Sequence, residues 1–168
     1  MLLCSANRRE SCLLALHHFV PLPVLFASAV EGDLVSKASI FLADDNPEVL
    51  SEVAEILESD YDIVASVLNG RSVLENWSRL TPDVIVLDIS MGEPNGIDVA
   101  VALRDSGCEA KIIFLTIHSD HDFVHAAMEV GGSGYVVKSQ LRSDLVEALR
   151  AVLSQKRFVS PCLQYQEQ

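Results

Sequence analysis

From residue 39 onward, short continuous apolar runs alternate with longer amphipathic stretches. A strand of a parallel sheet reads as a continuous apolar run, because helices cover both faces of the sheet. Five such runs are present, and they predict strands at residues 40–43, 63–66, 84–87, 112–115 and 134–137. The strict alternation is typical of a doubly wound α/β domain, so we expect a flavodoxin-like (βα)5 fold with a five-stranded parallel sheet.

The amphipathic stretches between these runs carry helix signals. Asn46 can cap a first helix, and Pro47 suits its first turn. Apolar residues at helical spacing form one face in this helix and in the helices on either side of the fifth strand. Those faces consist of Val49, Leu50, Val53, Ile56 and Leu57; Phe123, Ala126, Ala127 and Val130; and Leu141, Leu145, Ala148, Leu149 and Val152. Two further helices are expected near residues 72–80 and 97–104 on weaker signals.

The charge balance limits the partners of the chain. Lys and Arg number 12 against 24 Asp and Glu, which gives a formal net charge of -12. Such a charge repels the phosphate backbone of nucleic acids, so we expect no direct DNA binding. The same acidity is compatible with carboxylates gathered around a hard divalent cation such as Mg²⁺.

Polar side chains directly follow four of the five predicted strands. Asp44 and Asp45 follow the first strand, Asp88 the third, Thr116 the fourth and Lys138 the fifth. Ligands of open α/β sheets bind beyond the carboxyl ends of the strands, near the point where strand order reverses. We therefore expect these five side chains to meet at one edge of the sheet.

The three acidic side chains predict a metal ion. Carboxylates gathered at one edge repel one another unless a cation lies among them. Mg²⁺ prefers carboxylate, water and phosphate oxygens. Asp44, Asp45 and Asp88, with a backbone carbonyl near Ser90, supply a suitable set of ligands.

The same edge fits phosphoryl transfer to the protein. Asp88 can act as a nucleophile and form an acyl phosphate. Lys138 can then bind the phosphoryl oxygens as a point charge, and the Thr116 hydroxyl can donate a hydrogen bond to them.

With these residues identified, the stretch from about residue 38 to residue 156 resembles a response-regulator receiver domain. The resemblance rests jointly on residues 40–45, on 82–88 with Asn95 and Gly96, on 114–116 and on 134–138. Each of these pieces alone would be a weak signal.

The resemblance implies the part that each site residue takes. Asp88 is then the phosphoacceptor, Asp44 and Asp45 bind Mg²⁺, and Lys138 and Thr116 engage the phosphoryl group. Thr116 and Tyr135 would form a switch pair, in which the hydroxyl moves toward the phosphate and the ring follows inward. Tyr135 taken alone also fits a packed strand aromatic.

The resemblance also implies an output surface. The fourth helix, fifth strand and fifth helix would change shape for a partner, as a population shift favoured by contacts made only to the phosphorylated form. Ser90 and His118 occupy positions that tune the lifetime of the acyl phosphate in this family.

Within the family, Lys138 with Ser139 and the stretch 157–161 most resemble the NarL-like branch, whose members usually continue into a helix-turn-helix DNA-binding domain. Only eight residues follow Ser160, so we expect a stand-alone receiver with a short C-terminal tail at 157–168. The resemblance implies a cytoplasmic protein that is phosphorylated by a sensor histidine kinase or a phosphotransfer protein. It would contact a downstream protein target, would not bind a membrane and could form a homodimer on activation.

Residues 1–37 differ from the rest of the chain. They contain a broken apolar run at residues 12–26, followed by Ala27-Ser28-Ala29, which resembles a signal-peptidase site. The run is too short and too interrupted to span a bilayer. We favour a disordered extension or a misplaced start over an export signal, because the donors of a phosphorelay are intracellular.

Departures from the family pattern leave a second function open. Gly92 and Ser139 stand where many receivers have Pro, and Ile117 stands where a small residue is common. A pseudo-receiver that binds partners without being phosphorylated is compatible with these departures. A haloacid-dehalogenase-like phosphatase also forms an aspartyl phosphate, but it needs an acid-base Asp where Ser90 stands, so we do not expect a turnover enzyme.

Overall fold

Six parallel strands form the central sheet in the computed structural model, which describes residues 36–164. They are β1 (Ser39–Ala43), β2 (Asp62–Val67), β3 (Val84–Leu87), β4 (Lys111–Thr116), β5 (Gly134–Val137) and β6 (Phe158–Val159). Their order across the sheet is β2-β1-β3-β4-β5-β6, so the direction of winding reverses at β1. The predicted doubly wound α/β fold is confirmed.

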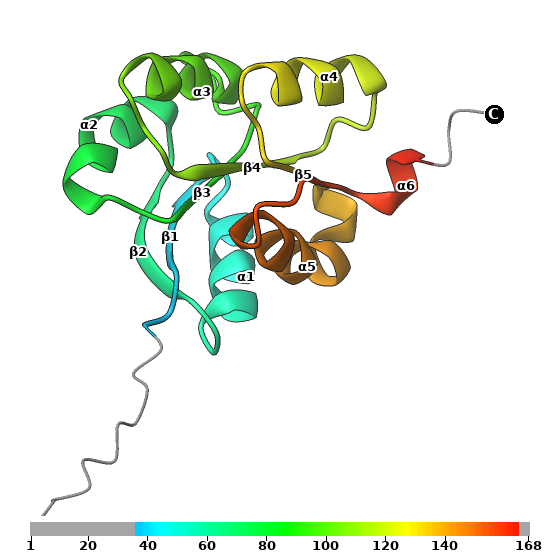
Figure 1. Cartoon of the computed structure of the whole chain (residues 1–168), viewed down its shortest axis with the longest axis horizontal. Helices are drawn as coiled ribbons and strands as arrows, with labels where there is room; N and C mark the ends of the chain where they lie inside the picture. The colour runs from blue at the N-terminus through cyan, green and yellow to red at the C-terminus, as the bar shows by residue number, and fades with distance from the viewer. Residues whose placement is uncertain (1–35, 165–168) are drawn as a thin grey trace, which may run out of the picture. The chain divides into compact units, whose positions relative to one another are not determined.

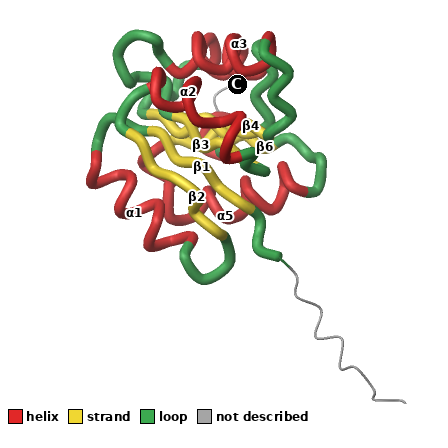
Figure 2. Tube along the Cα trace, turned by 90° about the vertical axis from the view of Figure 1, so that its left-hand side faces the viewer, coloured by secondary structure: helices red, strands yellow, loops and turns green. Residues whose placement is uncertain are grey.

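Helices cover both faces of this sheet (Figures 1 and 2). They are α1 (Pro47–Leu57), α2 (Gly70–Leu80), α3 (Gly96–Asp105), α4 (His121–Glu129), α5 (Leu141–Leu153) and the short α6 (Pro161–Gln164). Successive strand residues point to opposite faces. Leu42 therefore packs with residues of α1 and α5, such as Val53 and Leu145, while Phe41 packs in the cluster that α2, α3 and α4 cover.

Side-chain caps fix where two helices begin beside the site edge. The Asn46 side chain accepts a hydrogen bond from the backbone N–H of Glu48 at 2.9 Å, and Pro47 starts α1 as predicted. At α3, Asn95 and Asp98 form a reciprocal capping box. Both caps satisfy backbone N–H groups that have no partner inside the helix.

The sheet has one strand more than the five that the sequence predicts. Phe158 and Val159 pair in parallel with Gly134 and Tyr135 on the outer side of β5. A run of two residues carries no periodicity, so it could not be distinguished from a tail. Residues 157–164 of the predicted tail therefore contain β6 and α6.

The predicted N-terminal extension lies almost wholly outside the described residues, which begin at Ser36. Within residues 36–164, no helix is long and apolar enough to cross a membrane.

Arg104 ties the end of α3 to two neighbouring loops. Its Nη1 donates hydrogen bonds to the carbonyl oxygens of Cys108 at 2.7 Å and Ala110 at 3.0 Å. Its Nη2 donates to the carbonyl oxygen of Gly131 at 2.9 Å, in the loop between α4 and β5. One half-buried guanidinium thus supports both segments that lead into the central strands β4 and β5.

Replacing Arg104 by Ala should lower the free energy of unfolding by about 2–3 kcal/mol, because three carbonyl oxygens lose a charged donor. Urea denaturation of the purified protein measures this change. Arg71→Ala, at an exposed position of α2, is the control and should change stability by less than about 0.5 kcal/mol. Equal effects of the two substitutions would contradict the prediction.

Candidate functional site

Five predicted side chains lie at the carboxyl-terminal edge of the sheet. Asp44 and Asp45 follow β1, Asp88 follows β3, Thr116 ends β4, and Lys138 opens the turn after β5. Carboxylate oxygens of the three aspartates lie within 4.8 Å of one another. Asp44, Asp88 and Thr116 are buried, whereas Asp45 is exposed.

Lys138 joins the two buried carboxylates. Its Nζ lies 2.7 Å from Oδ2 of Asp44 and 3.2 Å from Oδ2 of Asp88. Both aspartate side chains are only 2% exposed, and the lysine side chain is 16% exposed. The Asp44 contact is a close ion pair, in which the ammonium offsets the burial of Oδ2 of Asp44.

Burial and charge act in opposite directions on these groups. Burial raises the pKa of Asp44 above its ordinary value, and the contact with Lys138 offsets this only in part. Burial alone would lower the pKa of Lys138, but its contacts with Asp44 and Asp88 outweigh burial and raise that pKa. Lys138 is therefore charged at neutral pH, and its ammonium contacts two of the three acidic side chains in the cluster.

The residues at this edge fit a Mg²⁺ ion. Oδ1 of Asp88 is buried and accepts no hydrogen bond within the described residues. A buried carboxylate oxygen without a donor is costly unless a cation or water satisfies it. Exposed Asp45 opens the cluster to solvent, and oxygen ligands with access for water are what Mg²⁺ requires.

Gly96 allows α3 to begin directly against the backbone of Asp88. A Cβ atom at this position would overlap the Asp88 carbonyl oxygen and would lie 2.8 Å from Cα of Ile89. The Gly96 N–H donates a hydrogen bond to the Ile89 carbonyl at 2.9 Å. Glycine is thus required by space at this position.

The loop after Asp88 also explains one departure from the family pattern. Gly92 has a φ of +83°. Proline cannot adopt this conformation, because its ring holds φ near about −65°. The loop therefore follows a different backbone path from one with Pro at this position.

His118 links the predicted switch residues. Its backbone N–H donates to Oγ1 of Thr116 at 3.2 Å, and its carbonyl accepts a hydrogen bond from the Tyr135 hydroxyl at 2.9 Å. Its Nε2 lies 2.9 Å from Oγ of Ser90, and its ring stacks on Phe123 with centroids 4.0 Å apart. The family resemblance implied that Ser90 and His118 occupy positions that tune acyl-phosphate lifetime, but no local signal in the sequence predicted that they touch.

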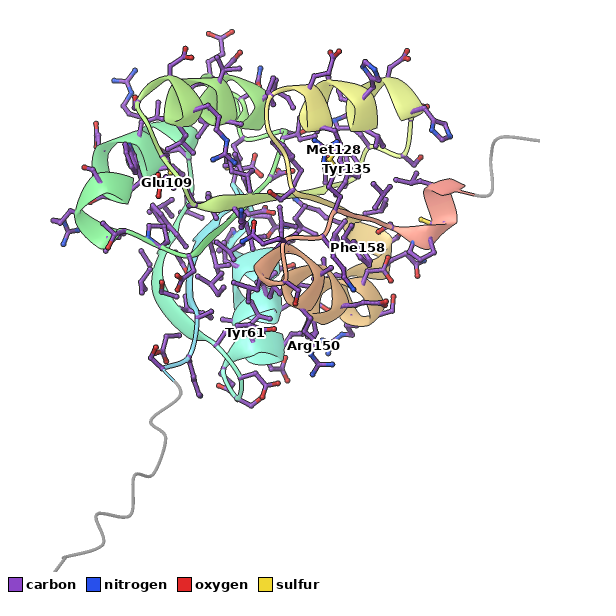
Figure 3. All side chains as sticks on the ribbon, viewed as in Figure 1. Tyr61, Glu109, Met128, Tyr135, Arg150 and Phe158 are labelled. Carbon is purple, nitrogen blue, oxygen red and sulfur yellow. The ribbon has the colours of Figure 1, made fainter. Side chains whose placement is uncertain are left out.

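Tyr135 is fully buried, with its ring on the side of the sheet that α4 covers, near Met128 (Figure 3). Burial, with a smaller contribution from the charge of Asp120, raises the pKa of its phenol far above the ordinary value. The hydroxyl therefore remains a hydrogen-bond donor to His118 throughout the physiological pH range.

This sheet edge, with its acidic cluster and lysine, defines a receiver domain. The family model of the "Response regulator receiver domain" matches residues 40–150, and the chain belongs to this family. Receiver domains are phosphoacceptor signalling modules that use Mg²⁺ at their acidic pocket.

Several known proteins are similar to this chain. The uncharacterized transcriptional regulatory protein YvfU of Bacillus subtilis is 33% identical over 128 residues, which cover 75% of this chain and 64% of that protein. The nitrate/nitrite response regulator protein NarP of Escherichia coli is 36% identical over 114 residues, which cover 67% and 53%. The crystal structure of a LuxR-family two-component response regulator from Aurantimonas sp. SI85-9A1 is 33% identical, with a TM-score of 0.73 and coverage of 77% and 94%.

These relatives confirm the resemblance to the NarL-like branch, and they are response regulators rather than turnover enzymes. The matches span only 64% and 53% of the length of the two curated relatives. The absence of a helix-turn-helix domain therefore stays a prediction, and so does the output of the whole protein.

Replacing Gly96 by Ala should lower the free energy of unfolding by about 1–3 kcal/mol, because the new methyl group meets backbone atoms that cannot move independently. It should also weaken Mg²⁺ binding, since the displaced backbone carries Asp88. Urea denaturation and calorimetric titration with Mg²⁺ measure the two effects. Val101→Ala, at an exposed position of the same helix, is the matched control and should leave Mg²⁺ affinity unchanged.

Proposed function

We propose that this chain accepts a phosphoryl group on Asp88 in a Mg²⁺-dependent reaction, and that phosphorylation switches a protein-binding surface. The observation that carries the proposal is the contact of the Lys138 ammonium with both buried carboxylates, 2.7 Å from Asp44 and 3.2 Å from Asp88. This geometry supports the proposal, because it brings a carboxylate that could act as nucleophile, an acidic cluster that could hold Mg²⁺ and a cation that could bind phosphate to one sheet edge.

In the proposed reaction, one carboxylate oxygen of Asp88 attacks the phosphorus of the donor. The bond from phosphorus to the donor breaks, and the leaving group keeps its electron pair, so an acyl phosphate forms on Asp88. A Mg²⁺ ion held by Asp44, Asp45, Asp88 and the Ser90 backbone carbonyl would supply positive charge near the phosphoryl oxygens.

Lys138 and Thr116 then bind the product. The ammonium transfers its contact from the carboxylates to a phosphoryl oxygen, which carries more negative charge. Without a phosphoryl group, the Thr116 oxygen accepts the His118 N–H at 3.2 Å, and the hydroxyl proton is free to be donated to an incoming phosphoryl oxygen.

The proposed switch follows from the two hydrogen bonds to His118. Turning the Thr116 hydroxyl toward the phosphoryl group removes the acceptor of the His118 N–H, while Tyr135 still holds the His118 carbonyl. The loop between β4 and α4 must rearrange around this residue, and the surface of α4, β5 and α5 changes with it.

The proposed partners follow from this chemistry. A sensor histidine kinase or a phosphotransfer protein supplies the phosphoryl group in the cytoplasm. The activated surface contacts a downstream protein or a second copy of the receiver. The net charge of -12 opposes direct contact between the receiver and DNA.

Asp88→Asn should abolish labelling by a small phosphodonor such as acetyl phosphate, because the amide is a far weaker nucleophile than the carboxylate. Intact mass spectrometry after incubation with the donor and Mg²⁺ measures the gain of one phosphoryl group. EDTA should prevent the gain in the wild type, and the control Asp105→Asn, at an exposed position on α3, should be labelled normally.

Two results would contradict the proposal. Labelling that persists in Asp88→Asn would place the acceptor elsewhere. A folded wild type that gains no mass with Mg²⁺ present would favour a pseudo-receiver that acts by binding alone.

Lys138→Ala should weaken binding of the phosphoryl analogue beryllofluoride at least about tenfold, the loss expected for a charge-assisted hydrogen bond. Its Mg²⁺ affinity should be equal or higher, because a competing cation is removed from the carboxylates. Fluorine NMR and calorimetric titration measure the two affinities. Lys111→Ala, which removes a lysine bonded to Gln155 at the other end of β4, is the control. Unchanged beryllofluoride affinity in Lys138→Ala would show that the lysine does not bind the phosphoryl group.

A further inference from the structure

The C-terminal segment (residues 158–163) lies along the outer edge of β5 (Figure 1). Strand β5 contains Tyr135, and Lys138 follows its last residue. Phe158 N–H donates a hydrogen bond to the Ser133 carbonyl at 3.1 Å, and Ser160 N–H donates to the Tyr135 carbonyl at 2.9 Å. The segment thus bonds directly to the strand that carries Tyr135 and leads into Lys138.

Ser160 continues this ladder with its side chain. Strand β6 ends at Val159, so no backbone carbonyl of β6 pairs with the N–H of Val137. Oγ of Ser160 accepts that N–H at 3.1 Å instead. Ser160 is fully buried, so its hydroxyl satisfies the Val137 N–H out of contact with bulk solvent.

Asp144 fixes the direction of the Ser160 hydroxyl. The hydroxyl donates its single proton to Oδ2 of Asp144 at 2.6 Å. Once the hydroxyl proton points at Asp144, the oxygen lone pairs point elsewhere. The Val137 N–H donates to one of these lone pairs. Oδ1 of Asp144 accepts a second hydroxyl, that of Ser143, at 2.7 Å, and Asp144 is only 7% exposed.

The hydrogen bond from the Val137 N–H to Ser160 holds the backbone one residue before Lys138. Val137 is held on its other side by β4, where it pairs with Thr116. The turn that follows, Lys138–Gln140, has no side-chain cap at its start, and the Ser143 hydroxyl lies 3.0 Å from the Gln140 carbonyl oxygen at its end. The backbone from which Lys138 reaches Asp44 and Asp88 is therefore held by β4 on one side and by Ser160 on the other.

The same segment also adjoins Tyr135. Val159 is paired with Tyr135 in the sheet, and Leu163, only 2% exposed, packs in the same core cluster as the Tyr135 ring. Figure 3 shows Phe158 on the opposite side of the sheet from Tyr135, toward α5. The segment thus contributes to the packing on both faces beside β5.

We propose that Ser160 and Asp144 are positioning residues for Lys138, and that the C-terminal segment is thereby coupled to occupancy of the Asp88 site. The coupling rests on the proposed phosphoacceptor function. When Lys138 binds a phosphoryl group, the Val137 backbone is held more firmly, and the hydrogen bond to Ser160 is stabilised. By linkage, an intact Ser160 bond must strengthen phosphoryl binding by the same factor.

A purely structural Ser160 would behave differently. If its hydroxyl only satisfied the Val137 N–H at the edge of the sheet, its removal would lower the free energy of unfolding and leave the affinity for beryllofluoride unchanged. The test therefore measures affinity and amide protection beside thermal unfolding.

The experiment compares the wild type with Ser160→Ala, Ser160→Thr and Ser154→Ala. Ser160→Ala should bind beryllofluoride, at saturating Mg²⁺, at least about fivefold more weakly, the low end of coupling between linked sites. Ser160→Thr keeps the hydroxyl and should restore binding. Ser154→Ala is the matched control, because it removes an exposed serine hydroxyl at the end of α5, away from Val137 and Asp144. It should stay within about twofold of the wild type.

Hydrogen exchange in the unmodified protein supplies an independent measurement. Beryllofluoride with Mg²⁺ should slow exchange of the Val137 and Ser160 amides at least about fivefold. The Lys111 amide, which bonds the Asp83 carbonyl at the opposite end of β4, is the internal control and should not respond. If Ser160→Ala fails to fold, this measurement decides alone.

The outcomes separate the two proposals. Beryllofluoride binding in the wild type, with unchanged affinity in folded Ser160→Ala, would overturn the positioning function of Ser160. Binding without slower exchange of the Val137 and Ser160 amides would overturn the coupling to the C-terminal segment. A wild type that binds no beryllofluoride would overturn the phosphoacceptor proposal, and the coupling with it.

Discussion

The contact between the Lys138 ammonium and the buried carboxylates of Asp44 and Asp88 holds the site together. Two carboxylates this deeply buried would be very costly without a nearby cation. The parallel sheet creates the arrangement, because β1, β3 and β5 all end at the same edge. A single ammonium leaves the cluster negative once Asp45 is counted, and this remaining charge is what a divalent cation would neutralise.

The neighbours of this ion pair offer two routes from the site to the surface. One passes through the loop after β4, where the backbone of His118 bonds to Thr116 of β4 and to Tyr135 of β5. The other passes through β5, where Val137 bonds to Ser160 immediately before Lys138. Both routes depend on few hydrogen bonds, which are part-buried at His118 and fully buried at Ser160, where an unsatisfied group is costly. Such bonds are suited to break or form together when the charge at Asp88 changes.

The sequence predicted the site better than its surroundings, for a physical reason. Asp44, Asp88 and Lys138 follow continuous apolar runs, and a buried strand places the next polar residue at the sheet edge. The contacts of His118 depend on the path of the β4–α4 loop, which no periodicity encodes. Ser160 and Asp144 are 16 residues apart, and they meet only because β6 adds to β5 in one register. A two-residue strand gives no signal from which that register could be predicted.

The sixth strand also changes what a partner would meet on the α4, β5 and α5 surface. An unpaired strand edge exposes N–H and C=O groups that could pair with another chain. Here the outer groups of Ser133, Tyr135 and Val137 are already bonded to residues 158–160. A partner on this side therefore contacts the helices or the C-terminal segment itself, unless that segment is displaced. Displacement would expose the buried Asp144 carboxylate and free the backbone before Lys138, so a partner that removed the segment would also act on the proposed phosphorylation site.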